Sequence, residues 1–304
     1  MGPSSKWLTA IDPSASVAAA ARVSLGARLT AVAHHLPLAA YHAEQDSEHV
    51  HRLRVSTRRA GAALKLYREW LPPKRFRWIE RRLKKIRRAA GEARDFDVLA
   101  ERLAHDYGAR AAAVAPLVAQ GRDNVQADIE RIAKKSRRDD RLVRKTARLI
   151  ESIRAPDDIQ AGAVAPPFRE WAAQQLDDVT RQFFDAVPHA TSDMAALHQF
   201  RIRAKSLRYA MELLAAAFGP ELRDVHYPVI EEVQERLGRI NDHVAARDLF
   251  RKWAADERFS SQKGLLCELA EDELALLADK LREFREWWTP SMAEQLSHKL
   301  ANSA

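Results

Sequence analysis

Basic side chains recur along residues 49–72 at a spacing that places several of them on one face of a helix. His51, Arg54, Arg58 and Lys65 step by three, four and seven residues. At about 100° per residue, they fall within about 60° of one another. We call these four residues the first basic stripe. Arginine, lysine and protonated histidine donate hydrogen bonds and carry positive charge, so the chemistry they favour is binding of an anion with many oxygen atoms.

The first basic stripe lies between two apolar strips of the same helix. The core-facing register consists of Val50, Leu53, Thr57, Ala60, Leu64, Tyr67 and Leu71. Val55, Ala62 and Leu66 form the second strip. A cation held between two packing surfaces needs compensation, either from carboxylates or from a bound anion.

The remaining wedge of this helix is predicted to face solvent. It consists of Arg52, Ser56, Arg59 and Ala63. If this prediction is right, the charges of the helix divide into a stripe that binds a ligand and a wedge that does not.

The same pattern returns 147 residues later in the chain. This offset lays "HRLRVSTRRAGAALKLYREWLPP" (51–73) on "HQFRIRAKSLRYAMELLAAAFGP" (198–220), and "AGEARD" (90–95) on "LGRIND" (237–242). The second basic stripe is His198, Arg201, Lys205 and Arg208. Glu212 follows Arg208 by one helical turn and is an expected partner for it.

The two copies differ in charge. Residues 48–100 contain 16 Lys and Arg against 6 Asp and Glu, a net of +10, whereas residues 195–247 contain 8 against 7, a net of +1. Much of the difference lies in the third helix, where Lys84, Arg87 and Arg88 correspond to Glu231, Gln234 and Glu235. We therefore add Lys84, Arg87 and Arg88 to the candidate site and expect the first copy to supply more of the affinity.

Composition favours an all-α protein with an anionic partner. The 304 residues have a net charge of +8 and include only 10 Gly and 13 Pro. No apolar run approaches the roughly 20 residues that a membrane-spanning helix needs, and no export or anchoring signal is evident. A single cysteine, Cys267, fits a reducing compartment. We expect a cytoplasmic protein without membrane insertion, and the sequence leaves its oligomeric state open.

Helix-capping residues and prolines predict eight or nine helices. The first four are expected at about 14–41, 46–72, 73–107 and 116–153, and the later ones at about 167–187, 192–218, 221–256, 261–288 and 290–301. We interpret the chain as an N-terminal tail (1–13), a four-helix repeat (14–153), a linker (154–166) and a second four-helix repeat (167–304). Each repeat is predicted to be an antiparallel bundle.

These motifs resemble the CHAD family, the conserved histidine α-helical domain. The motifs are "HRLRVSTRR", "GEARDFDVL", "HQFRIRAKSLRY" and "GRINDHVAARDLF", and the resemblance covers about residues 14–288 as one CHAD domain. It implies an internally duplicated helical fold that binds inorganic polyphosphate along a basic central pore or groove. The residues it implies as ligand-facing are His51, Arg54, Arg58, Arg94, His198, Arg201, Lys205 and Arg208. Some relatives carry a triphosphate-tunnel domain with an ExExK motif, which this sequence lacks.

Other chemistries are less well supported by the sequence. We expect no catalytic residues, no cofactor and no metal, because the histidines of the stripes lack a partnered carboxylate, and those of "HHLPLAAYH" (34–42) and "HVH" (49–51) lack zinc-like spacing. Asp95 and Asp242 are expected to pair with neighbouring arginines, among them Arg94 and either Arg239 or Arg247. The prediction is therefore non-enzymatic polyphosphate binding, with location at polyphosphate granules. Nucleic-acid binding and phosphate-ester hydrolysis are the alternatives.

Overall fold

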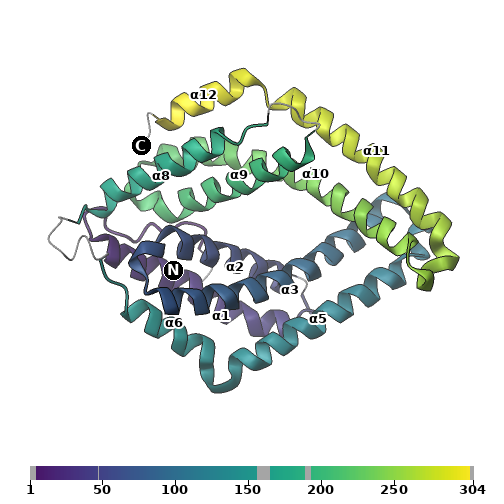
Figure 1. Cartoon of the computed structure of the whole chain (residues 1–304), viewed down its shortest axis with the longest axis horizontal. Helices are drawn as coiled ribbons and strands as arrows, with labels where there is room; N and C mark the ends of the chain where they lie inside the picture. Colours follow the sequence, from purple (N-terminus) through teal and green to yellow (C-terminus); the bar gives the residue numbers. More distant parts are fainter. Residues whose placement is uncertain (1–4, 47, 156–164, 189–192, 302–304) are drawn as a thin grey trace. The chain divides into compact units, whose positions relative to one another are not determined.

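The chain folds into α-helices, as the composition predicts. The computed structural model describes residues 5–46, 48–155, 165–188 and 193–301. Within these ranges every regular element is helical, and the β-type pairing they contain is an isolated bridge between Ser16 and Pro167. Figure 1 shows the helices coloured along the sequence. No helix of the described residues is long and apolar enough to cross a bilayer.

The first three helices begin and end where capping residues and prolines predict. Helix α1 (Val17–Tyr41) starts after Ser16, whose hydroxyl accepts a hydrogen bond from the backbone N–H of Ala19 at 3.3 Å. Helix α2 (Glu48–Leu66) continues into a 3₁₀ turn, η1 (Arg68–Trp70), and α3 (Pro73–Asp106) starts at a proline. Proline suits the first helical position because its missing N–H would have no helical acceptor there.

The predicted fourth helix (116–153) is broken. It consists of α5 (Ala115–Arg137), the 3₁₀ turn η2 (Arg138–Asp140) and α6 (Arg141–Glu151), and a short α4 (Ala109–Ala112) precedes it. Asp140 adopts φ 46°, a left-handed conformation that ends an α-helix. The sequence prediction missed the break because aspartate is tolerated within helices and only the backbone angle reveals the turn.

The later helices lie close to the predicted ranges. They are α8 (Phe168–Phe184), α9 (Met194–Leu214), η3 (Ala215–Ala217), α10 (Tyr227–Ala254), α11 (Lys263–Trp287) and α12 (Pro290–Ala301). A π-helical turn, η4 (Leu222–His226), precedes α10, and a 3₁₀ segment, η5 (Glu257–Gln262), precedes α11. Most of the predicted linker (154–166) lies outside the described residues.

The helices form two compact units. One comprises residues 1–100, 117–175 and 212–218, and the other comprises residues 101–116, 176–211 and 219–304. We call them unit 1 and unit 2. Each basic stripe therefore lies within one unit, the first in unit 1 and the second in unit 2.

Each unit has its own aromatic core. In unit 1, α1 packs against α2 and α6, and the rings of Tyr67 and Trp171 stack with centroids 5.0 Å apart. In unit 2, α10 packs along α11, as Figure 1 shows, and the rings of Phe183 and Phe200 stack at 4.9 Å. All residues of the predicted core register of α2 are buried, which fixes the rotation of that helix and hence the direction of its basic stripe.

Candidate functional site

The first basic stripe lies on α2 at the edge of the buried core. His51, Arg54 and Arg58 are half-buried, whereas Lys65 is exposed. The guanidinium of Arg54 forms an ion pair with Asp95 of α3 at 3.4 Å. Asp95 thus pairs with an arginine, as predicted for this carboxylate, and this arginine is Arg54. Helices α2 and α3 therefore face each other along the stripe.

His51 lies within the field of several arginines. Burial lowers the pKa of His51, and the positive charges of Arg94, Arg54 and Arg58 lower it further, against the opposing charge of Glu48. Arg94, a half-buried residue of α3, therefore acts on the same histidine as the stripe of α2. The structure therefore brings together four residues of the predicted site, namely His51, Arg54, Arg58 and Arg94.

A cleft of about 350 Å³ opens between α2 and α3 farther along the stripe. Its cationic lining comes from Lys65 of α2 and from Arg81, Lys84 and Arg87 of α3. Glu80 is the acidic residue among the described residues that line it. We call this feature the α2–α3 cleft. Phosphate oxygens are suitable ligands for such a set, because arginine donates in a bidentate fork and lysine supplies a mobile point charge.

Arg81 is a cleft residue that the predicted site did not include. The sequence contains a signal for it, because Arg81, Lys84 and Arg87 step by three residues along one helix. Arg88, which was predicted, lies on the exposed side of α3 and forms an ion pair with Glu92 at 2.8 Å.

The prediction that Arg52, Ser56, Arg59 and Ala63 face solvent is wrong for three of the four. Arg52 is exposed and lies 3.7 Å from Glu48. Ser56 and Ala63 are buried, and the side chain of Arg59 is 15% exposed. The reason is that this face of α2 also packs within unit 1, so that it is no solvent face.

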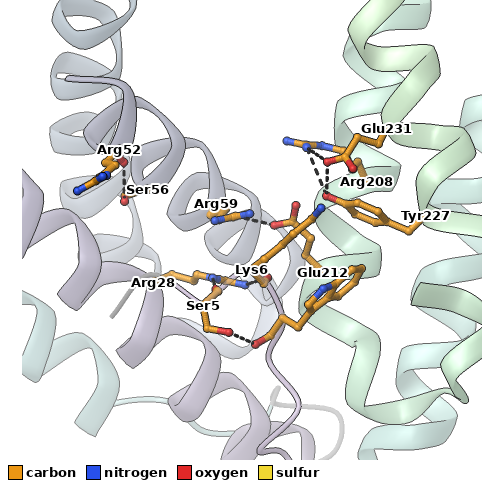
Figure 2. Close-up of polar contacts among 11 residues, drawn as sticks. Ser5, Lys6, Arg28, Arg52, Ser56, Arg59, Arg208, Glu212, Tyr227 and Glu231 are labelled. Atoms are coloured by element: carbon orange, nitrogen blue, oxygen red, sulfur yellow. Dashed lines mark hydrogen bonds and ion pairs between the residues drawn. The ribbon is translucent and has the colours of Figure 1, made fainter. Parts of the chain in front are cut away.

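Arg59 forms an ion pair with a carboxylate that the sequence assigned elsewhere. Its Nε donates to Oε2 of the fully buried Glu212 at 2.6 Å, a contact within unit 1 that Figure 2 shows. The backbone N–H of Leu8 also donates to the carbonyl of Glu212, at 3.3 Å. The expected partner of Glu212 was Arg208, one turn away on the same helix. The structure shows a partner 153 positions away in the sequence.

The second basic stripe in unit 2 also makes polar contacts with other helices. His198 is exposed, and Arg201 and Lys205 are half-buried. Arg201 donates to Oδ1 of Asn241 at 3.2 Å. Asp242 was expected to pair with Arg239 or Arg247, but these arginines pair with Glu235 and Asp248.

Arg208 contacts an acidic residue of α10. Its guanidinium donates to Glu231 at 3.1 Å and to the hydroxyl of Tyr227 at 3.3 Å, as Figure 2 shows. By the offset of 147 residues, Arg208 corresponds to Gly61, and Glu231 corresponds to Lys84. In unit 1, Gly61 leaves open space, since a Cβ placed there would meet no atom within 4 Å. In unit 2 an arginine and a glutamate occupy the equivalent positions and neutralise each other.

A sequence comparison with protein families identifies this helical architecture. The model of the CHAD domain matches residues 24–251, which is most of the chain. The chain belongs to the CHAD family. Both basic stripes and the α2–α3 cleft lie within the CHAD match. A comparison with curated protein sequences finds no match.

Solved structures with a similar fold include another CHAD domain. The crystal structure of the CHAD domain from the plant Ricinus communis is 22% identical, with a TM-score of 0.70 over 91% of this chain and 93% of that one. PptA from Streptomyces chartreusis is 17% identical, with a TM-score of 0.57 over 89% of this chain and 99% of that one. At these identities the likeness concerns the fold.

His34 and His35, which the sequence analysis considered as metal ligands, lie near other basic side chains. The rings of His34 and His35 meet edge to face at 4.9 Å. Burial lowers the pKa of His35 to about 4, with further lowering by the charges of His34, Arg52 and His49. No group of three or more His, Cys, Asp or Glu side chains among the described residues has a geometry that could hold a metal ion.

Proposed function

We propose that this CHAD domain binds inorganic polyphosphate through the α2–α3 cleft and the adjoining first basic stripe. The observation that carries the proposal is the cleft itself, in which Lys65, Lys84 and Arg87 converge from two helices on one open volume. His51, Arg54, Arg58 and Arg94 would continue the cationic lining along the same pair of helices.

Polyphosphate is the polyanion that suits this arrangement best. It is a flexible chain with a nearly uniform negative charge, so its recognition requires repeated contacts with oxygen atoms and no base-specific contact. The described lining of the cleft contains no aromatic side chain on which a nucleobase could stack. The chain belongs to the CHAD family, which is linked to polyphosphate binding, and this membership supports the same assignment.

The second basic stripe is proposed to contribute less. His198, Arg201 and Lys205 remain candidate contacts, but the charge of Arg208 is offset by Glu231. We propose that the internal duplication gave two related stripes, of which the first keeps an open cleft and the second is closed by an ion pair.

We also propose that the protein acts by binding alone, in the cytoplasm and at polyphosphate granules. The proposed contacts are hydrogen-bond donors and cations, which hold a phosphate chain but do not by themselves activate water for its hydrolysis.

A pair of double variants tests the cleft. Lys65→Ala with Lys84→Ala removes one cation from each helix of the cleft, and we expect it to weaken polyphosphate binding at least about tenfold, since charge-assisted contacts contribute about 1.5–3 kcal/mol each. The matched control is Arg52→Ala with Arg131→Ala, two cations of unit 1 whose side chains are 51% and 63% exposed. Isothermal titration calorimetry with long-chain polyphosphate measures both. Equal losses would show diffuse attraction and contradict the proposal.

Competition distinguishes polyphosphate from nucleic acid. Long-chain polyphosphate should displace a labelled polyphosphate at lower phosphate concentration than RNA or DNA at physiological salt, where non-specific phosphate contacts are weakened. Equal competition would favour a nucleic-acid binder. Sustained release of orthophosphate from polyphosphate with divalent metal ions would favour a hydrolase.

A further inference from the structure

Helix α3 carries a second set of cations on the flank away from the α2–α3 cleft. At 100° per residue, Trp78 lies about 180° and Arg82 about 140° around the helix from Arg87. This flank faces α6, because the side chains of Arg141 and Lys145 of α6 reach the ring of Trp78.

Three cations surround this one indole ring. The guanidinium carbons of Arg82 and Arg141 lie 5.7 Å and 5.8 Å from the ring centroid of Trp78, and Nζ of Lys145 lies at 5.8 Å. We call these four residues the Trp78 cluster. Cations within about 6 Å of an indole face are attracted by its quadrupole, so the ring acts as a support that holds the three cations together.

The described carboxylates do not balance the charges of the Trp78 cluster. Among the side chains that the structure describes, no Asp or Glu oxygen lies within 4.0 Å of these three cations. Burial lowers the pKa of Arg82, and the positive charge of Arg141 lowers it further. Arg82 and Lys145 are half-buried, whereas Arg141 is exposed. Gathering like charges beside half-buried side chains costs free energy that a bound anion would recover.

The basic surface continues beyond the Trp78 cluster toward the start of α3. Arg75 donates a hydrogen bond to the backbone carbonyl of Arg148, which shows that the start of α3 runs beside the end of α6. A surface cleft of about 690 Å³ follows there, and its charged lining consists of Lys74, Arg75, Arg77, Arg154 and Glu151. Four cations and one acid therefore extend the positive flank.

We propose that the Trp78 cluster is a second phosphate site of this protein and that it takes a short oligophosphate. Three cations around one ring form a compact site, in contrast to the extended basic stripe. A guanidinium that lies over an indole face keeps its N–H edge available for bidentate contact with a phosphate group. The terminal phosphate binds among Arg82, Arg141 and Lys145, and the following phosphates lie toward the cleft at Arg75. This site does not depend on the function proposed for the α2–α3 cleft.

The test uses the full chain in which that cleft is already disabled by Lys65→Ala and Lys84→Ala. We expect this variant to bind inorganic tripolyphosphate in isothermal titration calorimetry. Adding Arg141→Gln and Lys145→Gln should weaken that binding at least about tenfold, because two charge-assisted contacts are lost. Adding Arg138→Gln and Arg144→Gln instead removes the same charge from exposed positions nearby, and should weaken it less than about threefold.

Two results would overturn the proposal. One is the absence of tripolyphosphate binding in the cleft-disabled variant. The other is an equal loss of tripolyphosphate affinity on adding Arg141→Gln with Lys145→Gln and on adding Arg138→Gln with Arg144→Gln. Thermal unfolding of each variant verifies that it is folded. Loss of long-chain polyphosphate binding is a separate measurement, so failure of this site and failure of the function proposed above are distinguishable.

Fluorescence provides a second readout that does not depend on removing charge. Tripolyphosphate should change the emission of the intact protein, which has seven tryptophans, because it draws the cations away from one indole ring. The Trp78→Phe variant should lose this change. An unchanged signal in Trp78→Phe would show that the phosphates bind elsewhere.

Competition identifies the source of the oligophosphate. A polyphosphate chain end and a nucleoside triphosphate present the same terminal phosphates. The site would be supported if long-chain polyphosphate or ATP displaced tripolyphosphate from the cleft-disabled variant. The stronger competitor would show whether the site prefers a polyphosphate chain end or a nucleoside triphosphate. Displacement by neither would contradict it.

Discussion

At the scale of single residues, the first basic stripe is a set of basic side chains whose positive charges repel one another. Burial and the charges of Arg94, Arg54 and Arg58 lower the pKa of His51. The lowered pKa disfavours the protonated form of His51 while no anion lies near it. If a phosphate chain binds as proposed, its negative charge would favour protonation of His51.

We expect polyphosphate affinity to rise as the pH falls. A bound polyanion favours protonated His51 and raises its lowered pKa, so binding takes up a proton in the window around pH 5–7, and affinity is greater at about pH 5.5 than at about pH 8. His51→Gln should flatten this dependence, whereas His42→Gln, which replaces an exposed histidine hydrogen-bonded to Gln45, should retain it. Titration calorimetry over this pH range provides the measurement. The same slope in both variants would show that His51 does not contact the ligand.

At the scale of elements, α2 combines a core-facing register with a cationic edge, and one glycine shapes the cleft beside it. Gly61 is a helical position where a Cβ would meet nothing within 4 Å. Gly121 of α5 is the opposite case, since a Cβ there would lie 2.5 Å from the ring of Phe96. The first glycine leaves a space open, and the second allows α5 to approach α3 closely.

These two glycines should respond oppositely to alanine. Gly61→Ala should raise the free energy of unfolding by about 0.5–1 kcal/mol, because alanine loses less backbone entropy in a helix and no atom has to move. Gly121→Ala should lower it by about 1 kcal/mol or more, because the half-buried ring of Phe96 must shift to make room for the new Cβ. Urea denaturation measures both changes. Stabilisation by both substitutions would show that Phe96 moves aside freely.

At the scale of the whole molecule, ion pairs between distant parts of the sequence tie each unit together. In unit 1, Arg59 pairs with Glu212. In unit 2, the fully buried Glu273 of α11 accepts hydrogen bonds from Arg102 at 2.6 and 2.7 Å, from His243 at 2.7 Å and from Tyr107 at 3.1 Å. Burial raises the pKa of Glu273, but the hydrogen bonds from His243 and Arg102 outweigh it, so this pKa lies below its usual value.

Glu273 is expected to stabilise unit 2 at neutral pH and to lose this effect in acid. Glu273→Gln should lower the free energy of unfolding at pH 7 by on the order of 3 kcal/mol, since it removes a fully buried negative charge that pairs with the half-buried Arg102. A carboxylate with a lowered folded pKa stabilises above its unfolded pKa, so the difference from the unsubstituted protein should shrink as the pH falls below about 4.

The control for this prediction lies on the same helix. Glu268 pairs with Arg110 at 3.3 Å, and their side chains are 67% and 45% exposed. Glu268→Gln should change the free energy of unfolding by less than about 1 kcal/mol, because solvent screens exposed pairs. Denaturation curves at pH 7 and pH 3.5 measure both variants. If the loss of unfolding free energy in Glu273→Gln were the same at both pH values, Glu273 would not act as an ionised carboxylate at pH 7.

The sequence by itself determined most of the helix boundaries, the core register of α2 and the charge difference between the two copies. Val50, Leu53 and Leu64 are buried as their spacing predicts, and α3 starts at Pro73. These features could be predicted because helical periodicity, capping and proline act within a few residues along the chain.

Only the tertiary structure decided which charges remain open to a ligand. In the structure Arg59 pairs with Glu212, Arg208 pairs with Glu231, and Arg54 pairs with Asp95. Lys65, Lys84 and Arg87 line an open cleft. The tertiary structure also placed Arg141 and Lys145 beside Trp78 and broke the helix at Asp140. The physical reason is that an ion pair depends on distances between side chains far apart in sequence, which a local pattern does not contain.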